Sequence, residues 1–452
     1  MGSNVPASTR TSTRTSTRTS LIRAGMFAMF LGSVGGAIAL AQPAKVGPAK
    51  HLDALLALDK KFEGAGTCSG SSCHGGGDVK VPVTKIGSEF SIWQAKDAHA
   101  KAAVVITKPD LKANPWMKEI AGKLSVPEKD LLSSASCVSC HGSPVPPKLQ
   151  GAKFDQAEGV SCYQCHGPSE TWNKPHQTKG WADGERAKMD HAKLLSTHGL
   201  FDTRPAVQRA EMCASCHLAI DEKLVVAGHP QPVFEQLTFQ SEEPEHWIDR
   251  NAGYARLNLY AAGQVVAMRE TVAQLAMRPK DKAAFDQAAV HVRLVSLLVD
   301  AKAIPGDAAK AKALLTDIEA AKGDAAKLTA ASAAADALAP ALLDAIAKLP
   351  EAGDKATLKA TIAALAAADP ATFTAHGRRG IEQLYFAVDR LTQAYRDGAK
   401  IAVADFKPVR DALKPARDLK IYDARNTADV GTAATVVPAA VKDAAAKLAA
   451  MP

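Results

Sequence analysis

The chain has 452 residues with 47% hydrophobic side chains, which is enough material for two or three domains with ordinary cores. Its formal net charge is +8, but four arginines lie in the first 41 residues, so the rest of the chain carries a charge near +4. No basic cluster is present beyond that segment, so charge gives no support for a nucleic-acid partner.

Residues 1–41 have the features of an export signal. Four arginines precede an apolar run, AGMFAMFLGSVGGAIALA, which ends in Ala-Leu-Ala. A basic region, an apolar stretch and a small-residue end are typical of a cleaved signal peptide. The run also approaches the length of a bilayer span, so an uncleaved N-terminal anchor is the alternative. We expect a periplasmic or otherwise exported protein, with residues 42–60 as a linker.

All eight cysteines lie in four pairs, and each pair is followed directly by a histidine. The motifs are CSGSSCH (Cys68, Cys73, His74), CVSCH (Cys137, Cys140, His141), CYQCH (Cys162, Cys165, His166) and CASCH (Cys213, Cys216, His217). In such motifs two thiols attach covalently to a haem, and the adjacent histidine reaches the iron as its proximal ligand. The sequence therefore predicts four covalently attached haem c groups, with iron as the metal.

Two competing explanations for the cysteines are weaker. Disulfides occur in exported proteins, but they give no reason for a histidine after each pair. Zinc sites use C-x-x-C pairs, yet they do not need this order four times. The first motif has four residues between its cysteines instead of two, and Gly70 allows the extra residues to bulge away.

Distal iron ligands must come from other histidines, because a haem that only carries electrons usually has both axial positions filled. The candidates are His51, His99, His176, His191, His198, His229, His246, His291 and His376. An excess of histidine favours bis-histidine ligation, which generally gives lower potentials than a His/Met pair. His291 and His376 lie in predicted helices without cysteine, where we expect structural roles.

Several stretches resemble the cytochrome c554 family of multihaem cytochromes. They are WQAKDAHAKA with His99, GVSCYQCHGPSETWNKPH with His176, RAEMCASCHLAIDEKLVVAGHPQPVFEQL with His229, and PEHW at 244–247. The likeness covers residues 66–247 and implies four closely packed c-type haems, mostly with bis-histidine ligation. The chain departs from the family pattern at the long first motif and at Asp97, where the family has Ser.

In the leading hypothesis the distal ligands are drawn chiefly from His99, His176, His198 and His229. Three histidines, at positions 176, 191 and 198, lie between the third and fourth motifs. Which of these and His246 bind iron is left open by the sequence. In some family members one haem lacks a distal protein ligand, so a five-coordinate iron is compatible with the resemblance.

From about residue 252 the chain is rich in Ala, Leu, Lys and Asp, with apolar residues every three or four positions. This pattern predicts helices over 257–277, 283–303, 307–322, 325–348, 355–368, 372–398 and 433–450. Joined by short Pro/Gly breaks, these helices predict an antiparallel bundle. We therefore expect a mainly α protein, with a loop-rich tetrahaem domain at 61–251 and an Ala-rich helical domain at 252–452.

The leading hypothesis for function is an exported tetrahaem electron carrier, whose partners are other cytochromes or a membrane quinol-linked complex. The alternative is an oxidoreductase that acts on a small nitrogen or sulfur compound at one five-coordinate haem. His191, His198 or Lys193 would then donate protons. The helical domain would cover a haem edge, dock a redox partner or form a homo-oligomer, and the sequence does not separate these roles.

Overall fold

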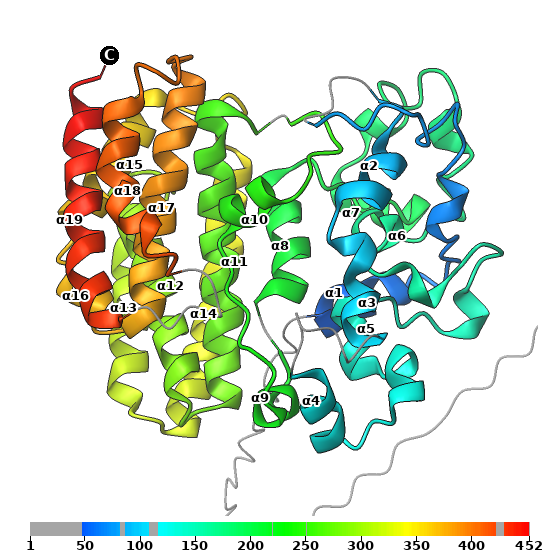
Figure 1. Ribbon diagram of the computed structural model, residues 1–452, viewed down its shortest axis with the longest axis horizontal. Helices are drawn as coiled ribbons and strands as arrows, with labels where there is room; N and C mark the ends of the chain where they lie inside the picture. The colour runs from blue at the N-terminus through cyan, green and yellow to red at the C-terminus, as the bar shows by residue number, and fades with distance from the viewer. Residues whose placement is uncertain are drawn as a thin grey trace, which may run out of the picture. The chain divides into compact units, whose positions relative to one another are not determined.

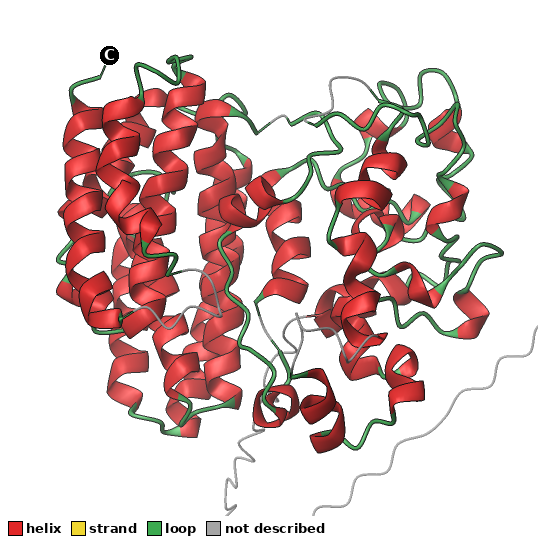
Figure 2. Ribbon diagram, viewed as in Figure 1, coloured by secondary structure: helices red, strands yellow, loops and turns green. Residues whose placement is uncertain are grey.

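The computed structural model of the chain describes residues 48–81, 86–107, 116–218, 220–249, 251–421 and 429–451. The expected export signal lies outside these ranges. Residues 43–452 form one compact unit. The described residues form helices and loops without a β-strand, apart from one isolated bridge between Phe62 and Gln150 (Figure 2). The predicted mainly α fold is confirmed.

The part of the chain before residue 250 consists of short helices joined by long loops (Figure 1). Its α-helices are α1 (Pro48–Leu56), α2 (Glu89–Lys96), α3 (Ala102–Thr107), α4 (Met117–Lys123), α5 (Ala135–His141), α6 (Cys162–His166), α7 (His191–His198), α8 (Ala206–His217), α9 (Glu222–Ala227) and α10 (Gln236–Glu242). Its 3-10 turns are η1 (Ala65–Thr67), η2 (His99–Lys101), η3 (Glu128–Ser133), η4 (Pro147–Leu149), η5 (Gln156–Glu158), η6 (Pro175–Gln177) and η7 (Arg186–Lys188). Each of the three C-x-x-C-H motifs closes a helix, namely α5, α6 or α8.

Two small apolar clusters hold this part together. The first contains Leu55, Phe62, Val145, Leu149, Tyr163 and Phe201. The second contains Ile106, Met117, Leu131, Cys137 and Val138. Helix α1 lies within the expected linker 42–60, and its Leu55 belongs to the first cluster. These clusters are small for a segment of this length, which would ordinarily bury well over half of its surface.

Long helices dominate the second part of the chain. The long helices are α11 (Arg256–Met277), α12 (Lys282–Asp300), α13 (Ala308–Ala321), α14 (Ala325–Ala347), α15 (Lys355–Ala367), α17 (Gly377–Gly398), α18 (Lys407–Asp418) and α19 (Val430–Ala449). Two short elements, η8 (Gly253–Ala255) and α16 (Ala371–Thr374), precede α11 and α17. The seven predicted segments are all helical. The segment predicted at 372–398 is divided at Ala375 and His376, and Gly377 at the start of α17 has a φ of 55°. Helix α18 was not predicted; it contains Pro408 in its first turn and Pro415 in its interior.

Aspartate determines where many of these helices begin. An aspartate side chain before the first turn accepts hydrogen bonds from backbone N–H groups that would otherwise lack partners. The aspartates that do so are Asp190, Asp221, Asp281, Asp307, Asp324, Asp354 and Asp429. These caps explain why the helix starts could be read closely from the sequence.

One large apolar cluster runs through the helical bundle and continues into the preceding part of the chain. The contributing residues before 252 are Val207, Ala210, Ala214, Leu218, Phe234 and Leu237. Helices α8 and α10 lie beside α11 (Figure 1). The core therefore crosses the predicted boundary at 251/252, and the limits of the two predicted domains stay a prediction.

Helix α14 is, within the described ranges, the one helix long and apolar enough to cross a membrane by length and composition. It packs against α11 and α13. Its buried residues recur every three or four positions, at Leu328, Ala331, Ala335, Ala339, Leu342 and Ile346. One buried stripe of this kind is typical of a helix in a soluble bundle.

Candidate haem-binding site

Three of the four motif histidines have a second histidine ring opposite them. The pairs and their ring-centroid distances are His74 with His176 at 6.2 Å, His217 with His99 at 5.9 Å, and His141 with His229 at 6.4 Å. A bond from a metal to an imidazole nitrogen is about 2 Å long, so two imidazoles on opposite sides of one metal have centroids about 6 Å apart. The three pairs therefore fit the axial positions of haem iron.

The fourth motif histidine, His166, has no histidine ring opposite it among the described ring contacts. Burial lowers the pKa of His166 to about 4, and the next contribution comes from the charge of His246. His246 is half-buried, and its Nδ1 lies 3.3 Å from the carbonyl oxygen of Pro244. His246 is thus the histidine outside the motifs that acts most on His166.

The structure does not bring His198 to a motif histidine. Its Nε2 lies 3.2 Å from Oε1 of Glu185 without hydrogen-bond geometry, and its ring meets Trp181 edge-on. His191 and His51 both pack edge-on against Phe201, with centroid distances of 4.5 and 4.9 Å. In the cysteine-free part, the buried histidines bond within the bundle: His291 to Gln264, and His376 to Asp286.

Several candidate ligands have their Nδ1 atom held by the protein. The Nδ1 distances are 2.8 Å from His74 to Glu89 Oε2, 3.0 Å from His99 to Asp97 Oδ1, 2.8 Å from His229 to Pro230 O, and 3.2 Å from His176 to Trp172 O. Metal-binding histidines commonly donate their second ring N–H to a carboxylate or a carbonyl, which fixes the tautomer and the ring orientation. In each case this leaves Nε2 available to iron.

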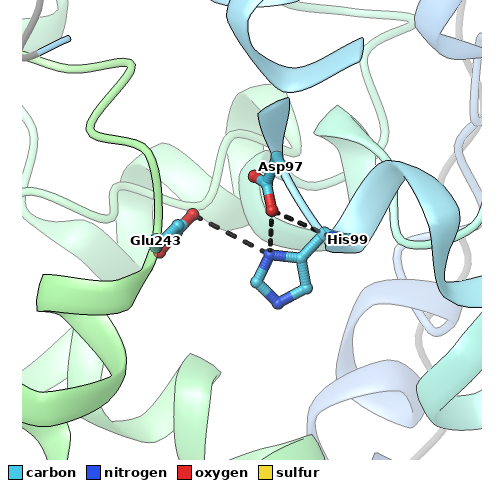
Figure 3. A group of neighbouring side chains, drawn as sticks. All are labelled: Asp97, His99 and Glu243. Carbon is cyan, nitrogen blue, oxygen red and sulfur yellow. Dashed lines mark hydrogen bonds and ion pairs between the residues drawn. The ribbon is translucent and has the colours of Figure 1, made fainter. Parts of the chain in front are cut away.

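Asp97, His99 and Glu243 form, in the described part of the chain, a group of side chains that could hold a metal ion, with their ligand atoms within 4.8 Å of one another. Nδ1 of His99 faces both carboxylates, at 3.0 Å from Asp97 and 3.9 Å from Glu243. Figure 3 shows the other ring nitrogen pointing away from both. The two carboxylates therefore hold the Nδ1 side of the His99 ring and leave its other nitrogen free of the cluster.

The charges in this cluster support that interpretation. Burial lowers the pKa of His99, but the hydrogen bond and the charge of Asp97 outweigh it and raise the pKa to about 9. Burial raises the pKa of Glu243 to about 7. Asp97 is almost completely buried, so its interaction with His99 is only weakly screened by solvent. The proton on Nδ1 of His99 is therefore strongly held.

Cysteines of different motifs approach one another. A hydrogen bond from Cys162 lowers the pKa of Cys68 to about 7, and one from Cys140 lowers the pKa of Cys216 to about 7. No disulfide joins any of the eight cysteines. The first motif therefore lies next to the third, and the second motif lies next to the fourth.

The long gap of the first motif forms a tight turn. The backbone N–H groups of Cys73 and Gly75 both donate to the carbonyl of Gly70, at 2.8 and 2.9 Å. A Cβ atom on Gly75 would lie 2.0 Å from the carbonyl oxygen of Ser69, so only glycine fits there. The turn keeps His74 adjacent to its cysteine pair while Cys73 remains exposed.

Residues 67–167, which hold the first three motifs, match the family model of cytochrome c554 and c-prime. Over these residues the chain is similar to the cytochrome c554 family. The predicted resemblance is confirmed over this stretch, and the match supports covalently bound haem c and haem-based electron transfer. The match ends before the fourth motif and the helical bundle. No curated protein and no solved structure gives a significant match to the chain.

Carboxylates that contact the candidate ligands were missed by the sequence analysis. Asp97 was noticed only as a departure from the family pattern, although an acid two residues before a candidate ligand is a usable signal. Glu89 and Glu243 lie 15 residues after His74 and 144 residues after His99, respectively. No local pattern connects residues at such separations.

Proposed function

We propose that the protein is an exported tetrahaem c-type cytochrome that transfers electrons between redox partners. The four cysteine pairs would attach four haem c groups, with His74, His141, His166 and His217 as proximal ligands. When bound, haem iron supplies reversible one-electron oxidation and reduction. The N-terminal sequence supports export, and cytochrome c domains are usually exported.

The observation that carries this proposal is the set of three histidine pairs. His176, His99 and His229 would be the distal ligands opposite His74, His217 and His141, at centroid distances of 5.9–6.4 Å. Two protein ligands on one iron leave no open position for a substrate. Filled axial positions favour electron transfer over bond chemistry at those sites.

Close packing is supported by the cysteine contacts. Thiols of the first and third motifs interact, as do those of the second and fourth. Cys165 of the third motif also lies within electrostatic range of Cys213 and Cys216 of the fourth. Groups attached to neighbouring motifs would therefore lie close together along the order first, third, fourth, second.

The remaining motif histidine is His166. We propose that His246 is its partner, as the fourth pair of axial ligands. The absence of a ring contact between them, among the described residues, favours the alternative function at this one site. An iron held only by His166 would leave a position open for a small nitrogen or sulfur compound. His191, His198 and Lys193 all lie on α7.

Exchange with a partner would take place where the first motif is exposed. Cys73 is the one cysteine of the eight that is classed as exposed, and the side chain of His74 is 31% exposed. We propose that other cytochromes, or a membrane quinol-linked complex, dock there. Homo-oligomerisation through the helical bundle stays a prediction.

The two functions are separated by the spin state of the ferric protein. EPR of the purified holoprotein should show low-spin signals that account for four haems, and the ferrous protein should bind no CO. A high-spin signal from one haem, with rapid NO or CO binding, would favour the oxidoreductase instead. His246→Ala should then separate the cases, because it opens the fourth site only if His246 is a ligand.

A further inference from the structure

The segment from Pro230 to Gln236, which directly follows His229, is inserted against the helical bundle. Phe234 is almost fully buried in the large apolar cluster, and Glu235 is also buried. Two prolines, at positions 230 and 232, restrict the backbone of this segment. The bundle therefore contacts the chain immediately beside a candidate iron ligand.

Polar side chains of α11, α12 and α17 hold this segment. Their hydrogen bonds are Gln231 Nε2 to Gln274 Oε1 (3.3 Å) and to Gln287 Oε1 (3.2 Å), Arg278 Nη2 to Gln231 Oε1 (3.2 Å), Arg379 Nη2 to Gln231 O (3.0 Å), Gln287 Nε2 to Pro232 O (3.5 Å), and Gln383 Nε2 to Phe234 O (2.9 Å). Both polar ends of Gln231 and its backbone carbonyl are used. Three helices thus converge on one residue, Gln231, two positions after His229.

The amides that make these bonds lie where an ordinary bundle would have apolar residues. Gln274, Gln287 and Gln383 are 1–3% exposed. Burying an amide costs free energy unless it is hydrogen-bonded, so such residues are unfavourable in a bundle that needs only to be stable. Their partners include the backbone of the inserted segment, which indicates that the segment is specifically seated.

Arg379 is also held in place. Its Nη1 lies 3.1 Å from Oε2 of Glu382, which is completely buried. The ion pair orients the guanidinium, so that its other nitrogen donates to the Gln231 carbonyl. An arginine fixed on both sides is a rigid support.

Gly263, in the middle of α11, allows the close approach. A Cβ atom there would lie 2.6 Å from Cβ of Gln236. Glycine inside a helix costs roughly 0.5–1 kcal/mol relative to alanine, and here it makes room for the segment. Gln236 in turn donates to Sγ of Cys213 at 3.6 Å, so the same segment also contacts the fourth motif.

We propose that the helical bundle positions the axial ligand His229, by seating residues 230–236 so that its imidazole stays opposite His141. This inference rests on the proposed function, in which His229 binds iron. Gln231 and Arg379 are the positioning residues, and they act through the backbone of the segment. The bundle is then a support for one haem ligand, in addition to being a fold of its own.

The experiment compares variants of the full-length holoprotein. Gln231→Ala removes the side chain at which three helices converge, and Arg379→Ala removes the bond to its carbonyl. His229→Ala is the reference for loss of the ligand, and Arg379→Lys is the conservative variant. Arg293→Ala is the matched control, because Arg293 lies on α12 but pairs with Glu319, away from the segment. Each variant is assayed for haem content, helix content, ferric EPR and CO bound per ferrous chain.

We expect His229→Ala to bind about one CO per chain and to lose about one quarter of the low-spin EPR intensity. Gln231→Ala and Arg379→Ala should bind less CO per chain than His229→Ala but more than the wild type, and should lose a smaller part of the low-spin EPR intensity. Both should keep four haems and the wild-type helix content. Arg379→Lys should be intermediate, and Arg293→Ala should match the wild type. A purely structural role would alter helix content without CO binding.

The inference is overturned if His229→Ala binds CO while Gln231→Ala and Arg379→Ala remain like the wild type. If either variant loses haem or helix, Arg379→Lys decides: CO binding above the wild-type level supports the inference, and none overturns it. If His229→Ala itself binds no CO, His229 is not the ligand. That result overturns the proposed ligation together with the inference, and the two failures are thereby distinguished.

Discussion

The imidazole rings of His74 and His176 lie nearly parallel, with an angle of 11° between their planes and 6.2 Å between their centroids. His74 belongs to the motif with the longer cysteine gap, and His176 lies on η6. The longer gap therefore does not prevent His74 from being presented like the other motif histidines. The turn around the Gly70 carbonyl accounts for this, because it takes up the extra residues.

Replacing His176 should open the iron position opposite His74. His176→Ala removes the distal imidazole, so one haem of four should become high-spin and bind CO when reduced. His198→Ala is the matched control, because His198 faces Glu185 rather than a motif histidine. Ferric EPR and CO titration measure both variants. A high-spin signal in His198→Ala, with none in His176→Ala, would reverse the assignment.

Replacing Asp97 should raise the reduction potential of the haem held by His99. The carboxylate increases the basicity of the imidazole and so stabilises the ferric state. Asp97→Asn keeps an acceptor for the Nδ1 proton but removes the charge. A tenfold change in relative affinity for the two oxidation states corresponds to about 60 mV for one electron.

Potentiometric titration followed by visible absorbance measures this shift. Glu243→Gln is the control, because Glu243 is 3.9 Å from the same nitrogen, compared with 3.0 Å for Asp97. Its effect should be smaller. Unchanged or lowered potentials in Asp97→Asn would contradict the positioning role of the carboxylate.

Acid should destabilise the helical bundle through His291. Burial lowers the pKa of His291 from 6.5 to about 3, with a further contribution from Arg379. The unfolded chain therefore binds this proton at a higher pH than the folded protein does. The stability is fully present above about pH 6.5 and decreases as the pH falls toward 3, by on the order of 4 kcal/mol in total.

His291→Gln removes this titration and keeps a donor for Gln264. Its free energy of unfolding should fall by about 2–3 kcal/mol less than that of the wild type between pH 7 and pH 4.5. Urea unfolding followed by far-UV circular dichroism gives both values. Equal losses in the two proteins would show that His291 is not responsible.

The haem-free chain should lose structure unevenly. The large apolar cluster of the bundle consists of side chains alone, whereas the part before residue 204 has only two small clusters. Chain made without haem attachment should therefore keep most of its helix signal and be cut by protease mainly between residues 61 and 203. Uniform digestion of the whole chain, or protection equal to that of the holoprotein, would contradict this expectation.

The bundle was predictable because its signals are local. Apolar residues at every third or fourth position and aspartate caps set the helices to within a few residues. Helix α18, with Pro415 in its interior, was the exception, although α14 and α19 were predicted in spite of their internal Pro340 and Pro438. The break between α16 and α17 was also not predicted, because no proline marks it.

The site was predictable only in part. The four motifs are local, and the resemblance to the family pointed to His99, His176 and His229. The pairing of each with a motif histidine depends on the three-dimensional fold, as with His99 and His217. The sequence did not separate His198 from His176, His191 and His246 as a ligand, and His246 is the one that lies within electrostatic range of His166.

The support beneath His229 could not have been read from the sequence. Gln274, Gln287 and Gln383 are polar residues on helices that the sequence predicts only as members of an antiparallel bundle. Their partners lie 43 to 149 residues away. A polar residue at a buried position is a usable signal, but it does not identify the segment that it binds.

The central claim, four haems with four motifs, is tested most directly by haem stoichiometry. A pyridine haemochrome assay on protein of known concentration, made with the haem-attachment machinery, gives the number of haem c groups per chain. Four per chain, with one fewer in a Cys137→Ser/Cys140→Ser variant, is the result that the account predicts. A chain with no covalent haem would contradict it and would leave a disulfide-linked or zinc-binding protein as the explanation of the cysteines.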